Sequence, residues 1–207
     1  MKSVREKSFH PVNSRNTVTT DYDCNVVYFV EQGSSNPIYS FLQKNKRQLM
    51  NITYMPKAYW CIAKTKQNEI IGIMGIDINT SSLPETFSHF VTEPYRFKKI
   101  GCHLEYLVSL IAKKFYAERI FLRSSSRDHI VLKMKREKDP SFSVLNDFND
   151  FSKDLCSKCA FFQQECVAQS FFLIDLNTRL QTLEIKLSTQ IQNKLKNLVE
   201  NYFNASE

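Results

Sequence analysis

The stretch Val91–Leu104, VTEPYRFKKIGCHL, carries the strongest indication of the fold. It joins a predicted strand to a predicted helix whose first turn is basic and contains Gly101. Backbone amides in the first turn of a helix have no partner inside it, and the helix dipole adds about half a positive charge there. Formal positive charge is added at the same place by Arg96, Lys98 and Lys99. These features together predict a binding site for a phosphate group.

In order and spacing this segment resembles the pyrophosphate-binding motif of the GCN5-related N-acetyltransferase (GNAT) superfamily. Leu104 supplies the apolar helix position that follows the motif, and the residues that match it are Val91, Pro94, Arg96 and Gly101. Two positions depart from the family pattern. Lys99 stands where the family usually has its first glycine, and Phe97 replaces another residue that is often glycine.

The resemblance implies an acyl-thioester donor, normally acetyl-CoA. The family holds the cofactor pyrophosphate with backbone amides, here those of Arg96, Phe97, Lys98, Lys99, Ile100, Gly101 and Cys102. In that family the strand before the loop splays from its neighbour. The backbone of this strand hydrogen-bonds the pantetheine and polarises the thioester carbonyl, and the corresponding residues here are Phe90, Val91 and Thr92.

The attacking amine must lose a proton, and the nearest general-base candidates are His89 and Glu93. Alternation along an extended strand places both on the face of Val91. Each has a structural alternative: a histidine hydrogen-bonded within the sheet, and a carboxylate stabilised by a helix start. The family often protonates the departing thiolate with a tyrosine on the next helix, but residues 126–138 contain none, which leaves His129 or water for that role.

Hydrophobic patterning along the chain predicts an α/β (α+β) domain over residues 21–176, with a mixed, mostly antiparallel central sheet flanked by helices, as in the GNAT fold. A basic arm, residues 1–20, precedes it. The predicted strands are 25–31, 59–65, 69–79, 85–93, 119–123, 159–165 and 170–175. The predicted helices are 36–50, with Asn36 as N-cap, then 96–117 and 126–138.

The C-terminal segment, residues 177–207, predicts one added long amphipathic helix, because apolar residues recur every three or four positions without glycine or proline. The stripe consists of Leu176, Leu180, Leu183, Leu187, Ile191, Leu195, Leu198 and Tyr202. It either packs across the domain, pairs with a second subunit as a short coiled coil, or binds a protein partner.

Composition is typical of a single globular domain in the cytoplasm. Hydrophobic residues make up 43% of the 207-residue chain, and the apolar runs are shorter than the roughly 20 residues of a membrane span. The first residues lack the apolar segment of a secretory signal. The six cysteines predict reduced thiols. A zinc site at Cys156, Cys159 and Cys166 would need a fourth ligand from a distant histidine such as His129. Phe161 and Phe162 instead favour a strand that carries cysteines, so we expect no metal.

The net charge of +7 is concentrated in residues 123–138. Such a basic face attracts a polyanionic cofactor or a nucleic acid, or is simply a solvated helix face, and no nucleic-acid motif accompanies it. We therefore expect an N-acyltransferase that uses an acyl-CoA, or a carrier-protein thioester, and an amine acceptor. The alternative is a catalytically inactive GNAT-fold protein that binds a protein partner or nucleic acid. The acceptor and the acyl-chain length stay open.

Overall fold

The computed structural model describes residues 18–20, 26–33, 35–45, 58–78, 83–125, 138–145 and 168–205. Several predictions lie wholly or almost wholly outside these residues: the basic arm before residue 18, the helix 126–138 with His129, the strand 159–165 and the cysteine cluster 156–166. Val18–Thr20, which the sequence placed in the arm, form a strand paired with Val26–Tyr28. The described strands are β1 (Val18–Thr20), β2 (Val26–Gln32), β3 (Tyr59–Lys64), β4 (Ile70–Asp77), β5 (Glu85–Val91), β6 (Arg119–Ser125), β7 (Phe142–Leu145) and β8 (Ala168–Asp175). The helices are α1 (Asn36–Lys44), α2 (Ile100–Lys114), α5 (Leu176–Lys186) and α6 (Thr189–Asn204), with a 3-10 turn, η2, at Glu93–Tyr95.

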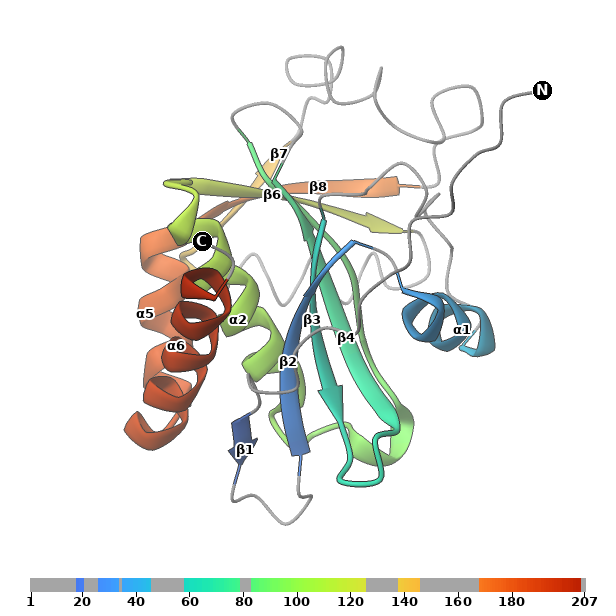
Figure 1. Cartoon of the computed structure of the whole chain (residues 1–207). Helices are drawn as coiled ribbons and strands as arrows, with labels where there is room; N and C mark the ends of the chain where they lie inside the picture. The colour runs from blue at the N-terminus through green and yellow to red at the C-terminus, as the bar shows by residue number, and fades with distance from the viewer. Residues whose placement is uncertain are drawn as a thin grey trace, which may run out of the picture.

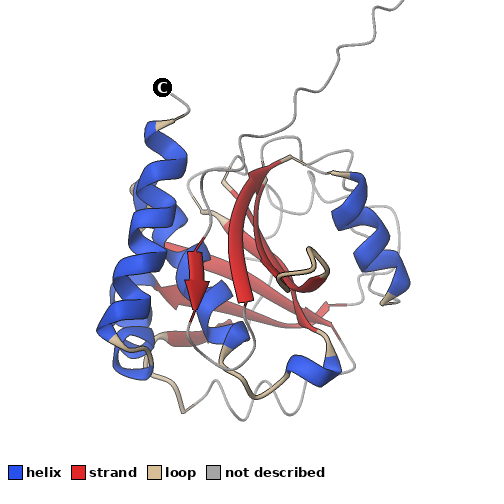
Figure 2. Cartoon of the chain, turned by 60° about the horizontal axis from the view of Figure 1, so that its bottom comes forward, coloured by secondary structure: helices blue, strands red, loops and turns tan. Residues whose placement is uncertain are grey.

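The strands form one twisted sheet in the order β1-β2-β3-β4-β5-β6-β8-β7 (Figure 1). Neighbouring strands are antiparallel except β5 and β6, which are parallel. Helices α2, α5 and α6 cover one face of the sheet and α1 covers the other (Figures 1 and 2). The predicted mixed, mostly antiparallel sheet flanked by helices is confirmed.

Two apolar cores flank the sheet. The larger lies between the sheet and α2, α5 and α6, and the smaller lies between the sheet and α1. Strands β3 and β4 are covered on both faces, so nearly every residue in them is buried. This explains why their sequences, YWCIAK and IIGIMGID, are continuous apolar runs rather than alternating ones. They form the predicted hairpin around residues 66–68.

Two helix starts differ from the sequence-based predictions. The N-cap of α1 is Ser35, in an extended conformation, and Asn36 is already helical. Helix α2 begins at Ile100 rather than at Arg96, because Phe97 and Lys99 have left-handed backbone angles, with φ of 64° and 60°. A right-handed helix cannot run through such residues. The basic residues therefore lie in a loop before the helix and not in its first turn.

The predicted single C-terminal helix is two helices. Leu187 is extended (φ −111°, ψ 142°) and ends α5, and Ser188 caps α6 by accepting a hydrogen bond from the Ile191 amide at 3.4 Å. Both helices pack along α2 (Figure 1). The apolar stripe is buried in the larger core, so it packs within the chain.

None of the described helices is long and apolar enough to cross a membrane. Within the same residues, no group of three or more histidine, cysteine, aspartate or glutamate side chains is placed to hold a metal ion.

Candidate functional site

The parallel strands β5 and β6 part after a short stretch of pairing. The register pairs only Glu85 with Phe121 and Thr86 with Leu122 among the described residues. Beyond these pairs β5 remains paired with β4, and β6 remains paired with β8. The two strands are therefore unpaired, with a gap between them, over the part of β5 that leads to the basic loop. This is the splay that the family resemblance implies.

The end of β5 presents the backbone amide of Val91 to this gap, as the hydrogen bonds of the next residue, Thr92, show. The Thr92 amide donates to Ile71 O at 2.8 Å, and its hydroxyl donates to the same oxygen at 3.1 Å. Since successive residues of a strand point their backbone groups to opposite sides, Val91 faces away from β4. The Val91 carbonyl accepts from Arg96 Nε at 3.2 Å. Of the three backbone positions predicted to bind pantetheine, Val91 is thus the one that faces the gap.

The loop that follows η2 leads into the N-terminus of α2 with two left-handed residues, Phe97 and Lys99. These are the two positions where the motif often has glycine, which adopts this conformation without strain. Lys99 is the N-cap of α2 and contributes no side-chain cap. The first intrahelical bond runs from the His103 amide to Lys99 O at 3.0 Å. The amides of Ile100, Gly101 and Cys102 come before this bond and have no acceptor within the helix, so they suit an anion.

The four loop residues Arg96–Lys99 before α2 are all exposed. Phe97 is fully exposed, at 103%, so it does not plug the site. Lys98 Nζ lies 5.5 Å from the Tyr95 ring centroid, and the Arg96 guanidinium carbon lies 5.9 Å from that of Phe90. Lys99 Nζ donates to Lys186 O, the last residue of α5, at 3.0 Å. The three cations surround the loop with positive charge.

His89 and Gly101 lie side by side. A Cβ built on Gly101 would lie 3.1 Å from His89 Nε2 and 4.0 Å from a methyl group of Val91. The glycine therefore leaves room for the imidazole against the first turn of α2. A pocket in the gap reaches from His89 to α5; it is lined by Met74, Thr86, His89, Glu105, Val108, Ser109, Ile120, Leu122, Ile174 and Arg179. It is narrow, with room for about one water molecule.

The second base candidate, Glu93, lies elsewhere. Strand β5 ends at Val91, so the alternation that would place Glu93 beside His89 stops before it. Glu93 is exposed in η2, and its carbonyl accepts from the Arg96 amide at 3.1 Å. A left-handed Ser88 (φ 53°) and a register shift between Ile73 and Gly75 further break the alternation of β5. The structure brings His89 to the gap and leaves Glu93 on the outside of the loop.

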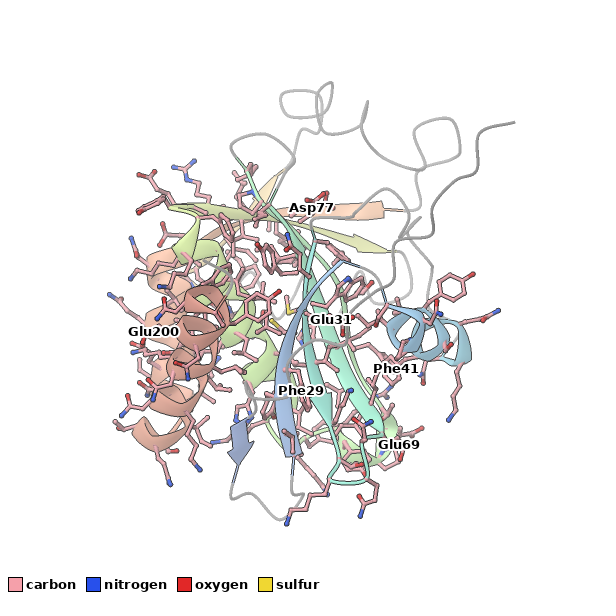
Figure 3. All side chains as sticks on the ribbon, viewed as in Figure 1. Phe29, Glu31, Phe41, Glu69, Asp77 and Glu200 are labelled. Atoms are coloured by element: carbon pink, nitrogen blue, oxygen red, sulfur yellow. The ribbon has the colours of Figure 1, made fainter. Side chains whose placement is uncertain are left out.

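Sequence reasoning missed two carboxylates at the closed end of the gap. Glu85 and Asp77 are register partners on β5 and β4, and only 5% and 7% of their surfaces are exposed. Glu85 also pairs with Phe121 of β6, where β5 and β6 are still joined. Asp77 is labelled at the end of β4 in Figure 3. Asp77 could have been noticed as the acidic end of the apolar run IIGIMGID, whereas Glu85 begins a strand that contains other polar residues. The strand order was needed to place either residue at the gap.

A buried polar pair supports α2 one turn after the loop. The Tyr28 hydroxyl and His103 Nδ1 lie 2.7 Å apart, and both side chains are buried. Burial, with a smaller contribution from the positive charge of Lys99, lowers the pKa of His103 to about 4. His103 is therefore neutral at neutral pH and adds no charge to the loop. For the Cys102 thiol, burial and then Glu105 raise the pKa, so this thiol is not an activated nucleophile.

Comparison with solved structures identifies proteins of the same architecture. An acetyltransferase of the GNAT family from Staphylococcus aureus Mu50 aligns with a TM-score of 0.53 and 17% identity, covering 72% of this chain and 99% of that chain. An IAA acetyltransferase from Bacillus cereus aligns with a TM-score of 0.52 and 17% identity over 72% and 99% of the two chains. A GNAT family acetyltransferase from Elizabethkingia anophelis, with acetyl-CoA bound, aligns with a TM-score of 0.51 and 17% identity over 73% and 98%.

No family model matches the sequence, and no curated protein matches it. The likeness is therefore one of fold, at an identity too low to carry over an activity or a substrate.

Proposed function

Because the chain has the fold of the GNAT acetyltransferases, we propose that it is an N-acyltransferase that moves an acetyl or other acyl group from an acyl-CoA to an amine by direct attack. The observation that carries the proposal is the continuity of the gap with the loop. The Val91 amide faces the gap between β5 and β6, and the strand leads directly into the unpaired first-turn amides of α2. A thioester arm and a pyrophosphate need this arrangement in this order.

The loop from Arg96 to Cys102 would hold the pyrophosphate. First-turn amides and the α2 dipole supply directed donors, while Arg96 and Lys98 supply charge. The backbone from Phe90 to Thr92 would guide the pantetheine, with the Val91 amide as donor to the gap. Bound acyl-CoA supplies an activated carbonyl, and a preformed amide donor stabilises the charge that develops on its oxygen.

His89 is the general base that the geometry favours, because it lines the pocket in the gap beside the first turn of α2. Glu93, exposed in η2, would act only through water. Glu85 joins these candidates because its buried carboxylate stands where the gap closes. A base is needed because an ammonium group has no lone pair with which to attack.

The second candidate function is binding without catalysis: a GNAT-fold protein that holds a protein partner or nucleic acid and transfers no acyl group. One observation favours it: the pocket has room for about one water molecule, so an acyl group must widen it to enter. A contact with a second copy or another protein through α5 and α6 would have to use their outer surface, where Ile185 is 87% exposed. The amine acceptor belongs to the transferase proposal alone and stays unspecified. A cytoplasmic location is proposed for either function.

Calorimetric titration with acetyl-CoA tests the proposal. We expect micromolar binding to the wild-type chain and none to Gly101→Glu, whose carboxylate would stand in the first turn of α2 and repel the pyrophosphate. Gln67→Glu adds the same charge in the exposed β3–β4 turn and should bind as tightly as wild type. Absence of binding at millimolar acetyl-CoA, and at millimolar longer acyl-CoAs, would contradict the proposal.

Turnover separates the two candidate functions. Binding followed by thiol release with any member of a panel of small amines, peptides and aminoglycosides would identify a transferase. Binding of acetyl-CoA without thiol release for any amine in the panel would favour the catalytically inactive protein.

A further inference from the structure

Phe97, in the loop before α2, is the most exposed large hydrophobic side chain among the described residues. Its exposed fraction is 103%, against 94% for Tyr116 and 87% for Ile185. At full exposure both faces of its ring meet solvent. Its backbone is left-handed, with φ of 64°, a conformation that favours glycine. Packing within the part of the chain that the structure describes therefore gives no reason for an aromatic ring at this position.

The cations on either side of Phe97 do not cover its ring. Arg96 Nε donates a hydrogen bond to Val91 O at 3.2 Å, so this side chain points back to the end of β5. Lys98 Nζ lies 5.5 Å from the ring centroid of Tyr95, in η2. The two side chains leave the Phe97 ring open and add positive charge to the loop beside it.

In the proposed complex the two ends of acyl-CoA would lie in different surroundings. The thioester arm would enter the gap beside Val91, and the amides of Ile100–Cys102 would hold the pyrophosphate. The adenosine is attached to the pyrophosphate on the side opposite the arm, so it would leave the gap toward the exposed loop Arg96–Lys99. Phe97 precedes Ile100 by three residues, at most about 11 Å of chain. Only the ribose separates the base from the pyrophosphate, which puts the ring within reach of the base.

We propose that Phe97 is the platform on which the adenine of acyl-CoA stacks. This inference deepens the proposed function and rests on it. Every base has a π-face, and an aromatic side chain binds that face by offset stacking, in which the two rings exclude water from each other. The neighbouring cations Arg96 and Lys98 attract the phosphates on both sides of the adenosine. Bound acyl-CoA thus buries a ring that the free protein leaves exposed.

The stacking platform makes Phe97 a residue that determines which acyl donor is used. A thioester on a carrier protein has a phosphate on its pantetheine arm but no nucleotide, so the ring adds nothing to its binding. Acyl-CoA carries the base and gains the stacking interaction. The platform therefore favours acyl-CoA over a carrier-protein thioester, the two donors between which the sequence does not choose.

Calorimetric titration of Phe97→Gly tests the platform in a variant that should fold. Glycine removes the ring and favours the left-handed backbone, so the loop keeps its path. We expect Phe97→Gly to bind acetyl-CoA about tenfold more weakly than the wild type, because one base–aromatic stack is lost. Acetyl-4′-phosphopantetheine, which has the same thioester and one phosphate but no adenosine, should bind both proteins equally. Phe97→Tyr keeps an aromatic face and should bind acetyl-CoA like the wild type.

Tyr116→Gly is the matched control for the loss of an exposed ring. Tyr116 is also left-handed, with φ of 57°, but it lies just past the other end of α2, after Lys114. Its replacement removes an exposed aromatic ring and relieves the same backbone strain. Because it lies away from the loop, Tyr116→Gly should leave the affinity for acetyl-CoA unchanged.

Phe97→Trp supplies a second measurement that needs no thioester. The chain has one tryptophan, Trp60, which is only 1% exposed, so the new indole is distinguished by its exposure. Adenosine 3′,5′-bisphosphate, a fragment of CoA, should quench the fluorescence of the new indole when its base stacks on it. The indole of Tyr116→Trp should not be quenched at the same concentration.

The platform and the proposed function fail separately. Equal affinity of wild type and Phe97→Gly for acetyl-CoA would overturn the platform and leave the acyl-CoA site in place. An equal loss for acetyl-CoA and acetyl-4′-phosphopantetheine would also overturn it, because the ring would then act on the arm and not on the base. Quenching that is absent in Phe97→Trp, or equal in Tyr116→Trp, would contradict stacking at the loop. Absence of acetyl-CoA binding to the wild type would overturn both proposals.

Discussion

At the scale of single residues, the loop before α2 uses backbone conformations that its side chains do not favour. Phe97 and Lys99 are both left-handed, which costs roughly 1–2 kcal/mol for each non-glycine residue. Lys99 recovers part of this through its bond to the C-terminal end of α5. Phe97 is fully exposed and has no burial to offset the strain. The departures from the motif therefore cost stability while they preserve the path of the backbone.

Phe97→Gly should stabilise the protein by about 1 kcal/mol, because glycine adopts positive φ without a Cβ clash. Urea unfolding measures the change. Lys98→Gly is the matched control, since Lys98 is an exposed neighbour without a left-handed backbone. It should lower stability by some tenths of a kcal/mol through the entropy of the unfolded chain. Equal effects of the two glycines would contradict the strain argument.

Burial of His103 makes stability depend on pH. Its pKa is about 4 in the folded protein and about 6.5 when exposed, so the unfolded chain takes up a proton at a higher pH than the folded one. The stabilisation is complete above pH 6.5 and is lost as the pH falls toward 4. We expect about 2 kcal/mol less unfolding free energy at pH 5 than at pH 7.

Urea unfolding of His103→Gln at the same two pH values checks this assignment. The variant is less stable at neutral pH but has no imidazole to titrate, so its stability should change little between pH 7 and pH 5. A loss as large as that of the wild type would place the titrating group elsewhere.

At the scale of the elements, the sequence predicted most strands and misplaced the helix boundaries. The paired runs YWCIAK and IIGIMGID predict their hairpin because both are apolar and a polar turn separates them. The break between α5 and α6 was missed because the apolar stripe continues through it, and only the cap at Ser188 marks it. Strands β1 and β7 were missed because their three and four residues give too little pattern.

Capping explains where α5 begins. The Asp175 carboxylate accepts a hydrogen bond from the Thr178 amide at 2.8 Å. Hydrogen bonding from the side chain and the amide of Thr178 lowers the pKa of Asp175. Asp175→Ala should cost about 1 kcal/mol of unfolding free energy. Gln181→Ala, at an exposed position within α5, should change it by less than about 0.5 kcal/mol. Equal effects in urea unfolding would mean that the cap contributes nothing.

At the scale of the whole molecule, α5 and α6 are part of the fold. The apolar side chains that α6 buries against the larger core are Ile191, Leu195, Leu198 and Val199. Each contributes roughly 1.5–3 kcal/mol, and together they approach the 5–15 kcal/mol of a typical domain. A chain that ends at Leu187 should therefore show no cooperative thermal transition. A chain that ends at Asn204 should melt like the full chain, and a folded Leu187 truncation would contradict this account.

The overall arrangement followed from the sequence more readily than the site did. The motif around Gly101 predicted the strand, the loop, the helix and the gap that the structure contains. The pairing of Arg179 with Glu105 was beyond sequence reasoning because the two residues are 74 positions apart and meet only when α5 packs on α2. Glu93 was predicted beside His89 because alternation was extended past the end of β5.

Hydrogen–deuterium exchange with and without acetyl-CoA tests the central claim most directly. If the loop before α2 and the end of β5 bind the cofactor, peptides covering Val91–Cys102 should gain protection. The exposed β3–β4 turn should not gain protection, and Gly101→Glu should abolish the effect. Saturating acetyl-CoA that leaves Val91–Cys102 unprotected, or that protects only another part of the chain, would contradict the account.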